Sequence, residues 1–86
     1  MDIKKIAYLE RGKVKYKILK ELNTPKTPTI LAKKLNTHRS GVSRILLELK
    51  NKELVKCLNP EDKRTRFYQI TEIGKKLIEE YETLNN

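Results

Sequence analysis

Residues 38–44, with the sequence HRSGVSR, combine short and long polar side chains at the start of a helical pattern. The long side chains of Arg39 and Arg44 end in guanidinium groups, which donate hydrogen bonds to phosphate and to the edge of guanine. The short residues are Ser40, Gly41 and Ser43. Small side chains let a helix approach a large ligand closely, so this segment indicates recognition of a polyanion rather than catalysis.

Gly41 and His38 each allow a second interpretation. Gly41 weakens a helix by about 1 kcal/mol relative to alanine, and this cost is explained either by close approach to DNA or by tight packing of another helix. His38 is the one histidine of the chain, whereas a zinc site needs three or four ligands. We therefore expect His38 to be exposed or next to a phosphate, and we expect no metal site.

A second cationic segment lies in the connection of residues 59–66, NPEDKRTR, which contains Lys63, Arg64 and Arg66. The functional interpretation is a basic loop that grips a nucleic-acid backbone, and the alternative is a solvated loop whose acidic residues shape the turn. Thr27 and Thr29 flank Pro28 at a helix start. Their hydroxyls suit phosphate binding, although Thr27 is equally suited to simple capping.

The overall charge also favours a polyanionic partner. The 86 residues include 20 Lys and Arg against 11 Asp and Glu, for a net charge of +9 at pH 7. Residues 23–53 contain seven basic and two acidic residues, whereas residues 71–86 contain two basic and four acidic ones. We therefore expect the middle of the chain to face the polyanion and the C-terminal segment to face away from it.

Several other classes of function have little support. One histidine and three glycines allow neither a Ser-His-Asp set nor a glycine-rich phosphate loop, so we expect neither an enzyme nor a cofactor. The lone Cys57 excludes an internal disulfide and fits a cytoplasmic protein. We expect it to pack as a small hydrophobic residue, with redox sensing as the alternative. The sequence contains no apolar run long enough to span a membrane and no secretory signal.

Helical periodicity predicts the elements that position these residues. One helix is expected over residues 10–22, with further helical turns before it and a possible bend at Gly12. A short helix is expected over 28–35, started by Thr27. A longer helix over 38–51 follows across a tight turn. We expect Thr37 to cap it and an inward stripe to hold it against the core; that stripe consists of Val42, Ile45, Leu46 and Leu49.

The rest of the chain changes pattern after residue 51. The segments of residues 54–58 and 66–70 are short and rich in β-branched or aromatic residues, and a charged turn connects them. This pattern predicts a β-hairpin. Tyr68 and Ile70 share one face of its second strand. A last helix, capped by Thr71, carries Ile73, Leu77, Tyr81 and Leu84 at helical spacing. The fold class is therefore α+β and mainly α, in one domain over residues 1–86.

This order of elements is that of a winged helix-turn-helix: three helices, a hairpin wing and a C-terminal helix. The segments LAKKLN, VSRILLEL, ELVK, NPEDKR and YQITEIGKKL also resemble the winged-helix transcription regulators of the MarR and ArsR type, especially compact archaeal ones. The resemblance covers residues 12–80. It implies that helix 38–51 enters the major groove of DNA and that loop 59–66 is the wing on the backbone.

The sequence departs from that family in two respects. Ile30 stands where many relatives carry a capping glutamate, and an exposed isoleucine there would suit a subunit contact. The chain also lacks the longer terminal helices that build dimers and ligand pockets in MarR-type proteins. A small-molecule effector therefore does not follow from the resemblance.

The terminal segments predict a homodimer, because their apolar residues exceed what one small core needs. The expected interface residues are Ile3, Ile6, Tyr8, Leu9, Leu77, Ile78, Tyr81 and Leu84. The alternative is that the last helix merely covers its own hairpin. A symmetric dimer would place two reading helices about 34 Å apart, which predicts a palindromic DNA site.

The functional hypothesis from the sequence is a sequence-specific regulator that binds double-stranded DNA. Two other classes stay open. One is a protein-interaction module built on the same fold, and the other is an architectural protein that coats nucleic acid without sequence preference.

Overall fold

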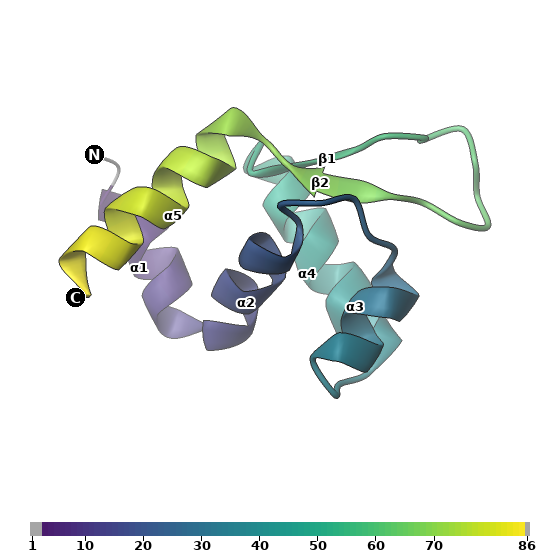
Figure 1. The fold of residues 1–86 in the computed structure, drawn as a ribbon, viewed down its shortest axis with the longest axis horizontal. Helices are drawn as coiled ribbons and strands as arrows, with labels where there is room; N and C mark the ends of the chain where they lie inside the picture. The colour runs from purple at the N-terminus through teal and green to yellow at the C-terminus, as the bar shows by residue number, and fades with distance from the viewer. Residues whose placement is uncertain (1–2, 86) are drawn as a thin grey trace.

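The helices and strands occur in the predicted order, but several of them begin or end at residues other than those predicted. Over residues 3–85, the computed structural model contains five helices and a two-stranded antiparallel hairpin (Figure 1). In chain order these are α1 (Ile3–Arg11), α2 (Lys13–Glu21), α3 (Pro28–Lys34), α4 (Arg39–Asn51), β1 (Val55–Cys57), β2 (Tyr68–Ile70) and α5 (Glu72–Leu84).

The helix predicted over residues 10–22 is two helices, with the break at Gly12. The Gly12 backbone is extended, with φ −146° and ψ 98°, so the helical hydrogen bonds cannot continue through it. Its amide donates to the Leu9 carbonyl at 3.2 Å, and its own carbonyl accepts from the Lys15 amide at 3.0 Å. Residues 10 and 11 therefore belong to α1, which packs against α5 rather than extending α2.

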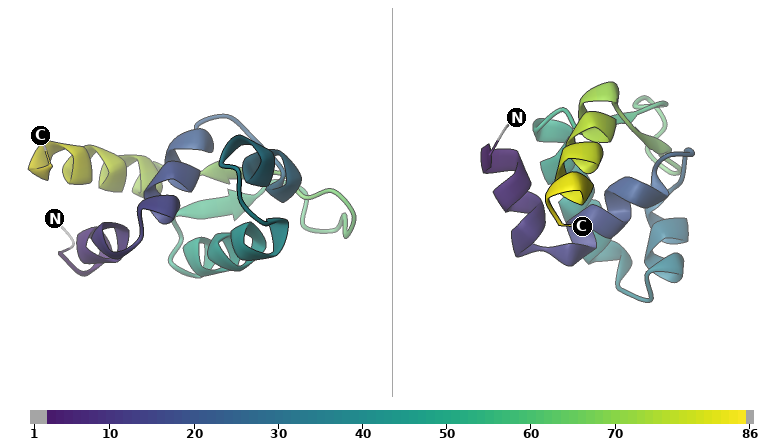
Figure 2. Two further views of the ribbon diagram at one scale, coloured as in Figure 1. Left: turned by 90° about the horizontal axis from the view of Figure 1, so that it is seen from below. Right: turned by 60° about the vertical axis from the view of Figure 1, so that its left-hand side comes forward.

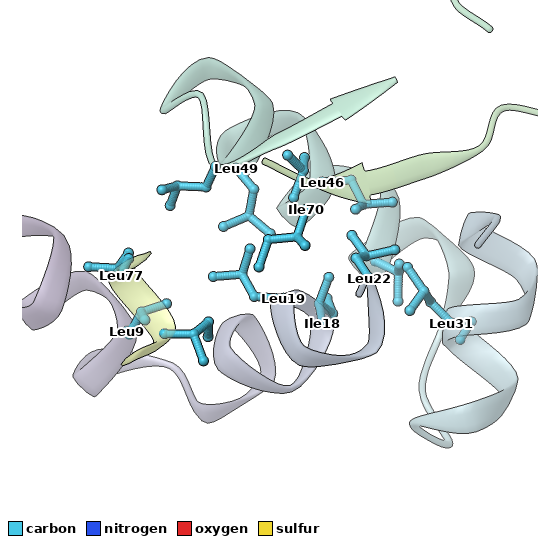
Figure 3. Close-up of a cluster of buried hydrophobic side chains, with 14 of the residues drawn as sticks. Leu9, Ile18, Leu19, Leu22, Leu31, Leu46, Leu49, Ile70 and Leu77 are labelled. Carbon is cyan, nitrogen blue, oxygen red and sulfur yellow. The ribbon is translucent and has the colours of Figure 1, made fainter. Parts of the chain in front are cut away.

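The hydrophobic core lies between α2, α4, α5 and the hairpin, and it receives side chains from every helix and both strands (Figure 3). Val42, Leu46 and Leu49 of α4 are buried there, while Ile45 is half-buried, in agreement with the predicted inward stripe. Leu9, Ile18 and other large aliphatic residues are completely buried. Burial of such side chains contributes about 1.5–3 kcal/mol each, which fixes the orientation of α4 about its axis.

The turn between α3 and α4 is a closed C-terminal cap. Asn36 adopts the left-handed conformation with φ 52°. The Asn36 amide donates to the Lys33 carbonyl at 3.2 Å, and the Thr37 amide donates to the Ala32 carbonyl at 2.9 Å, as in a Schellman motif. Asparagine tolerates this backbone conformation better than most residues do.

Thr37 does not cap α4, so that expectation is wrong. Thr37 still completes the end of α3, and the residue at the N-cap of α4 is His38, whose side chain makes no capping hydrogen bond. The cap predicted at Thr27 is confirmed, because its hydroxyl accepts from the Ile30 amide at 3.2 Å. The cap predicted at Thr71 is also confirmed, by the Gly74 amide at 3.0 Å.

The two strands of the hairpin are shorter than predicted. The loop between α2 and α3 adds a backbone pairing on the other side of β2. Its register pairs Val55 with Ile70 and Cys57 with Tyr68. On the other side of β2, the backbones of Lys26 and Tyr68 exchange two hydrogen bonds, of 3.1 and 2.9 Å. This bridge ties the start of α3 to the base of the hairpin loop.

Four residues predicted at a dimer interface lie inside the chain's own core. Ile6, Leu9, Leu77 and Ile78 are buried because α1 and α5 pack against one another. The expectation of surplus apolar surface is therefore wrong for these four. The alternative supposed that the last helix covers its own hairpin, and α5 packs against α1 and α2 as well as β2. By contrast, Ile3 is 76% exposed and Leu84 is 56% exposed.

The two tyrosines of the expected interface are half-buried and hold helices together. The Tyr8 hydroxyl donates to Glu48 of α4 at 2.9 Å, and burial with this bond raises the pKa of Tyr8. The Tyr81 ring lies 4.9 Å from the ring of Tyr16 in α2. Next to it, Glu82 accepts hydrogen bonds from Lys20 and from Tyr16, which lower its pKa.

The molecule is elongated, with the hairpin loop at one end. The ends of α1 and α5 lie together at one end, and the loop of the hairpin projects at the other (Figures 1 and 2). The longest extent is 37 Å. Within residues 3–85, no helix is long and apolar enough to cross a membrane.

Candidate nucleic-acid interface

The outward face of α4 carries side chains at the same spacing as its inward face. Ser40, Ser43, Arg44 and Leu47 are exposed and recur at i, i+3, i+4 and i+7. Because the buried residues of α4 point into the core, this second stripe must point away from it. The structure therefore presents two serines, one arginine and one leucine on a free surface of the helix.

No other element within residues 3–85 packs against Gly41. A Cβ atom placed on Gly41 would meet no atom within 4 Å. The alternative explanation from the sequence, tight packing of another helix, is therefore wrong. Gly74 shows the contrast, because a Cβ atom there would lie 2.4 Å from the Leu54 carbonyl oxygen. Gly74 is a packing glycine, whereas no packing contact within residues 3–85 requires glycine at position 41.

The loop of the hairpin is ordered by its own polar side chains. The Asp62 carboxylate accepts from the backbone amides of Thr65 and Arg64 at 3.1 and 2.8 Å, and these bonds lower its pKa. Asn59 accepts from the Phe67 amide at 2.8 Å and donates to the Thr65 carbonyl at 2.7 Å. The prediction that acidic residues shape the turn is confirmed for Asp62.

Arg66 takes part in this loop structure, because its Nε donates to the Asp62 carbonyl oxygen at 3.0 Å. Lys63 and Arg64 are exposed, and their side chains have no hydrogen bond or ion pair with the described part of the chain. The loop thus holds one arginine in place and leaves two cationic side chains available at its tip.

A groove with a volume of about 640 Å³ brings the separate segments together. Its walls are the start of α3, the outward side of α4 and the loop of the hairpin, and the predicted site residues lining it are Thr27, Thr29, Arg39, Ser43, Lys63, Arg64 and Arg66. The bridge between Lys26 and Tyr68 positions these walls relative to one another.

A second hollow lies around the turn between α3 and α4. It is lined by Thr29, Lys33, His38 and Arg39, among others. The N-terminus of α4 opens here without a side-chain cap and without an acidic residue in its first turn. Free amides and the helix dipole favour an anion at such a position. Thr27 already uses its hydroxyl as the cap of α3 and is buried, so Thr29 is the more accessible of the two.

Ser40, Gly41 and Arg44 line neither hollow; Ser40 and Arg44 are exposed and Gly41 is half-buried. Arg39 and Arg44 also have no ion-pair partner within residues 3–85. Elsewhere, Glu21 neutralises Lys26 and Lys34, and Glu82 neutralises Lys20. Within the described part of the chain, Arg39 and Arg44 of α4 and Lys63 and Arg64 of the hairpin loop thus keep their charge without an ion pair, as do several lysines elsewhere, and their field attracts polyanions.

Two contributors to this site are not among the residues predicted from the sequence. Leu47 lines the groove, and its position opposite the buried stripe of α4 was visible in the helical spacing. Asn59 organises the loop from its base, which the sequence indicated only as a turn-forming residue.

Within residues 3–85, these residues form neither a metal site nor a thiol site. Residues 3–85 hold no group of three or more His, Cys, Asp and Glu side chains placed to bind a metal ion. Cys57 is half-buried at the base of the hairpin, with its sulfur 3.9 Å from Asn59 Oδ1.

Comparison with known proteins decides the family. The winged helix-turn-helix family model matches residues 10–86. The chain belongs to this family. In winged helix-turn-helix terms, α3 and α4 are the helix-turn-helix, α4 is the recognition helix and the loop between β1 and β2 is the wing. No match is found among the curated proteins.

Solved structures of MarR-type regulators share this winged helix-turn-helix. A cysteine-to-serine mutant of MarR from Escherichia coli, complexed with operator DNA, matches with a TM-score of 0.77 and 28% identity over 92% of this chain. A MepR-like protein complexed with pseudoligands matches with a TM-score of 0.74 and 30% identity over 83% of this chain. The archaeal regulator BldR from Sulfolobus solfataricus shares the fold, with a TM-score of 0.75 and 23% identity over 94% of this chain.

The chain spans between about half and two thirds of the length of these neighbours. It spans 59% of the MarR chain, 52% of the MepR-like chain and 63% of the BldR chain.

Proposed function

We propose that this protein is a transcription regulator that binds double-stranded DNA in a sequence-specific manner. The recognition helix α4 enters the major groove, and the wing contacts the phosphate backbone beside it. Arg39, Ser40, Ser43 and Arg44 contact bases or adjacent phosphates. Lys63, Arg64 and Arg66 hold the backbone, together with Thr29, His38 and the amides at the start of α4.

The observation that carries this proposal is the groove between α3, α4 and the wing. Arg39, Lys63 and Arg64 in its walls form no ion pair within residues 3–85, and these cations come from segments that are far apart in the sequence. Cations gathered in one groove without ion pairs favour a polyanionic ligand. A duplex carries phosphates on both sides of its major groove, which matches cations on both the recognition helix and the wing.

The related MarR structure supports the same arrangement, because that protein is in complex with operator DNA. We extend the comparison to a homodimer on a palindromic site. Two copies would meet through the end of the molecule where α1 and α5 lie, which is remote from the wing (Figure 2). Exposed Ile3 and Leu84 are at that end, and the acidic charge of α5 keeps it away from DNA.

The test is a pair of substitutions on a duplex selected from a random pool. Arg44→Ala should lower affinity for the selected duplex and reduce its preference over random duplex, because a base contact contributes about 1–3 kcal/mol of discrimination. Lys63→Ala should weaken binding to both duplexes alike and reduce the slope of log affinity against log salt by about 0.9. Binding is measured by fluorescence anisotropy over a range of salt concentrations.

Lys76→Ala on α5 is the matched control, since it removes one exposed positive charge from outside the groove. It should change neither preference nor slope by a comparable amount. Equal affinity of the wild type for selected and random duplexes would favour the architectural alternative. Binding that does not depend on salt would contradict DNA binding through this groove.

A further inference from the structure

Leu47 is an aliphatic residue placed where the recognition helix is otherwise polar. It follows Ser43 by four residues and Arg44 by three, so it continues the outward stripe of α4. Its exposed fraction is 59%, although its neighbours Leu46 and Leu49 are almost completely buried. The Leu47 side chain therefore contributes little to the hydrophobic core of the protomer.

The surroundings of Leu47 identify what would cover it. Leu47 lines the same groove as Arg39, Ser43 and the cationic residues of the wing. A protein partner that covered Leu47 would also have to neutralise these charges, which a duplex does with its phosphates. An apolar contact inside the major groove then requires an apolar group on a base edge. Among the four bases, thymine alone presents one there, its C5-methyl group.

We propose that Leu47 determines specificity by packing against the C5-methyl group of a thymine in the major groove. This inference rests on the proposed function and deepens it, because it names a base that the recognition helix selects. Arginine and serine on the same stripe bind phosphates or several base edges, whereas the methyl contact distinguishes thymine from every other standard base. The same chemistry would accept 5-methylcytosine, and the experiment separates these two sources.

The experiment uses the full chain and the duplex that it prefers after selection from a random pool. Each thymine of that duplex is replaced by deoxyuridine, which removes only the methyl group and keeps base pairing. At one position, or at one symmetric pair of positions, we expect affinity to fall roughly fourfold per methyl group lost. Leu47→Ala should bind the thymine duplex more weakly and should bind the thymine and deoxyuridine duplexes equally at that position.

Two controls keep the interpretation specific. Ile73→Ala truncates an exposed aliphatic residue on α5, and it should keep the full sensitivity to deoxyuridine. A duplex with 5-methylcytosine paired to guanine at the sensitive position should bind more tightly than one with cytosine, but less tightly than the thymine duplex if other contacts also select that base pair. Circular dichroism melting should show that Leu47→Ala stays folded, because the side chain is largely exposed.

The result that overturns the inference is specific binding in which no thymine methyl matters, or in which Leu47→Ala remains as sensitive to deoxyuridine as the wild type. That result would leave the proposed function intact. Equal affinity for selected and random duplexes would overturn the proposed function and the inference together.

Discussion

At the residue scale, Gly41 lowers the stability of the helix, and its value is expected to lie in the proposed function. Glycine inside a helix is destabilising because the unfolded chain loses more conformational freedom when it folds. Packing within the protomer does not require glycine here, since an added Cβ atom would meet no neighbouring element within 4 Å. The proposed function offers a reason for a residue without a side chain here, because close approach of DNA to the start of α4 would need that space.

Gly41→Ala should therefore make the protein more stable and its DNA complex weaker. We expect the free energy of unfolding to rise by about 1 kcal/mol in urea denaturation. We expect affinity for the selected duplex to fall several-fold, because the added methyl group would keep the helix from the groove. Affinity that is unchanged, or increased, would contradict the close approach.

The matched substitution is Gly74→Ala in α5. Its new Cβ would collide with the Leu54 carbonyl and with Ile70, so the free energy of unfolding should fall by about 1–3 kcal/mol or more. This pair of variants distinguishes a glycine that serves the protomer from one that serves its ligand.

At the scale of elements, the wing is held by hydrogen bonds rather than by packing. Residues 61–67 are all exposed, and the loop has no buried side chain to order it. Asp62 and Asn59 supply the bonds instead. An ordered loop loses less conformational entropy when it binds, so these residues should contribute to affinity without touching the ligand.

Asp62→Ala should loosen the wing while leaving the global fold intact. The measurement is amide hydrogen exchange at Arg64 and Thr65, which should become faster in the variant, together with a melting temperature that changes little. Glu61→Ala is the control, because its exposed neighbouring carboxylate makes no hydrogen bond within residues 3–85. Unchanged exchange in Asp62→Ala would mean that the carboxylate does not order the loop.

The pH dependence of the wing follows from the lowered pKa of Asp62. A lowered pKa means that the folded loop favours the carboxylate, so its stabilisation is complete above the ordinary pKa of about 4. It is lost as the pH falls through the lowered value. The amide chemical shifts of Arg64 and Thr65 should therefore stay constant at neutral pH and change only below about pH 4.

At the scale of the whole molecule, the shape separates two functions. The wing and α4 lie toward one end, while Ile3 and Leu84 are exposed toward the other. A twofold contact at the second end would leave both recognition helices free. Because four of the predicted interface residues are buried in the core, the proposed contact would use fewer apolar residues than the sequence suggested.

Substituting both Ile3 and Leu84 with glutamate should convert the proposed dimer to a monomer. Sedimentation velocity should show the halved mass, and affinity for a palindromic site should fall at least tenfold, while affinity for an isolated half-site stays the same. Ile73→Glu serves as the control, since it adds charge at an exposed aliphatic position near the other end of α5. A wild-type chain that sediments as a monomer at all concentrations would refute this interface.

Features that depend on residues close together along the chain could be predicted without a structure. The buried face of α4 follows from the spacing of Val42, Leu46 and Leu49, and the caps at Thr27 and Thr71 follow from one residue type beside a helix start. Boundaries were predicted less well where local preferences compete. Gly12 breaks a helix that the apolar spacing alone would continue, and Thr37 is used to end α3 before it can cap α4.

The meeting of distant segments could be read only from the folded chain. Ile6, Leu9, Leu77 and Ile78 are apolar whether they face a second subunit or their own core, and the packing of α1 against α5 settles that choice. The groove likewise depends on the bridge between Lys26 and Tyr68, which are 42 positions apart. Such contacts depend on the free energy of burying many side chains at once, so no local spacing encodes them.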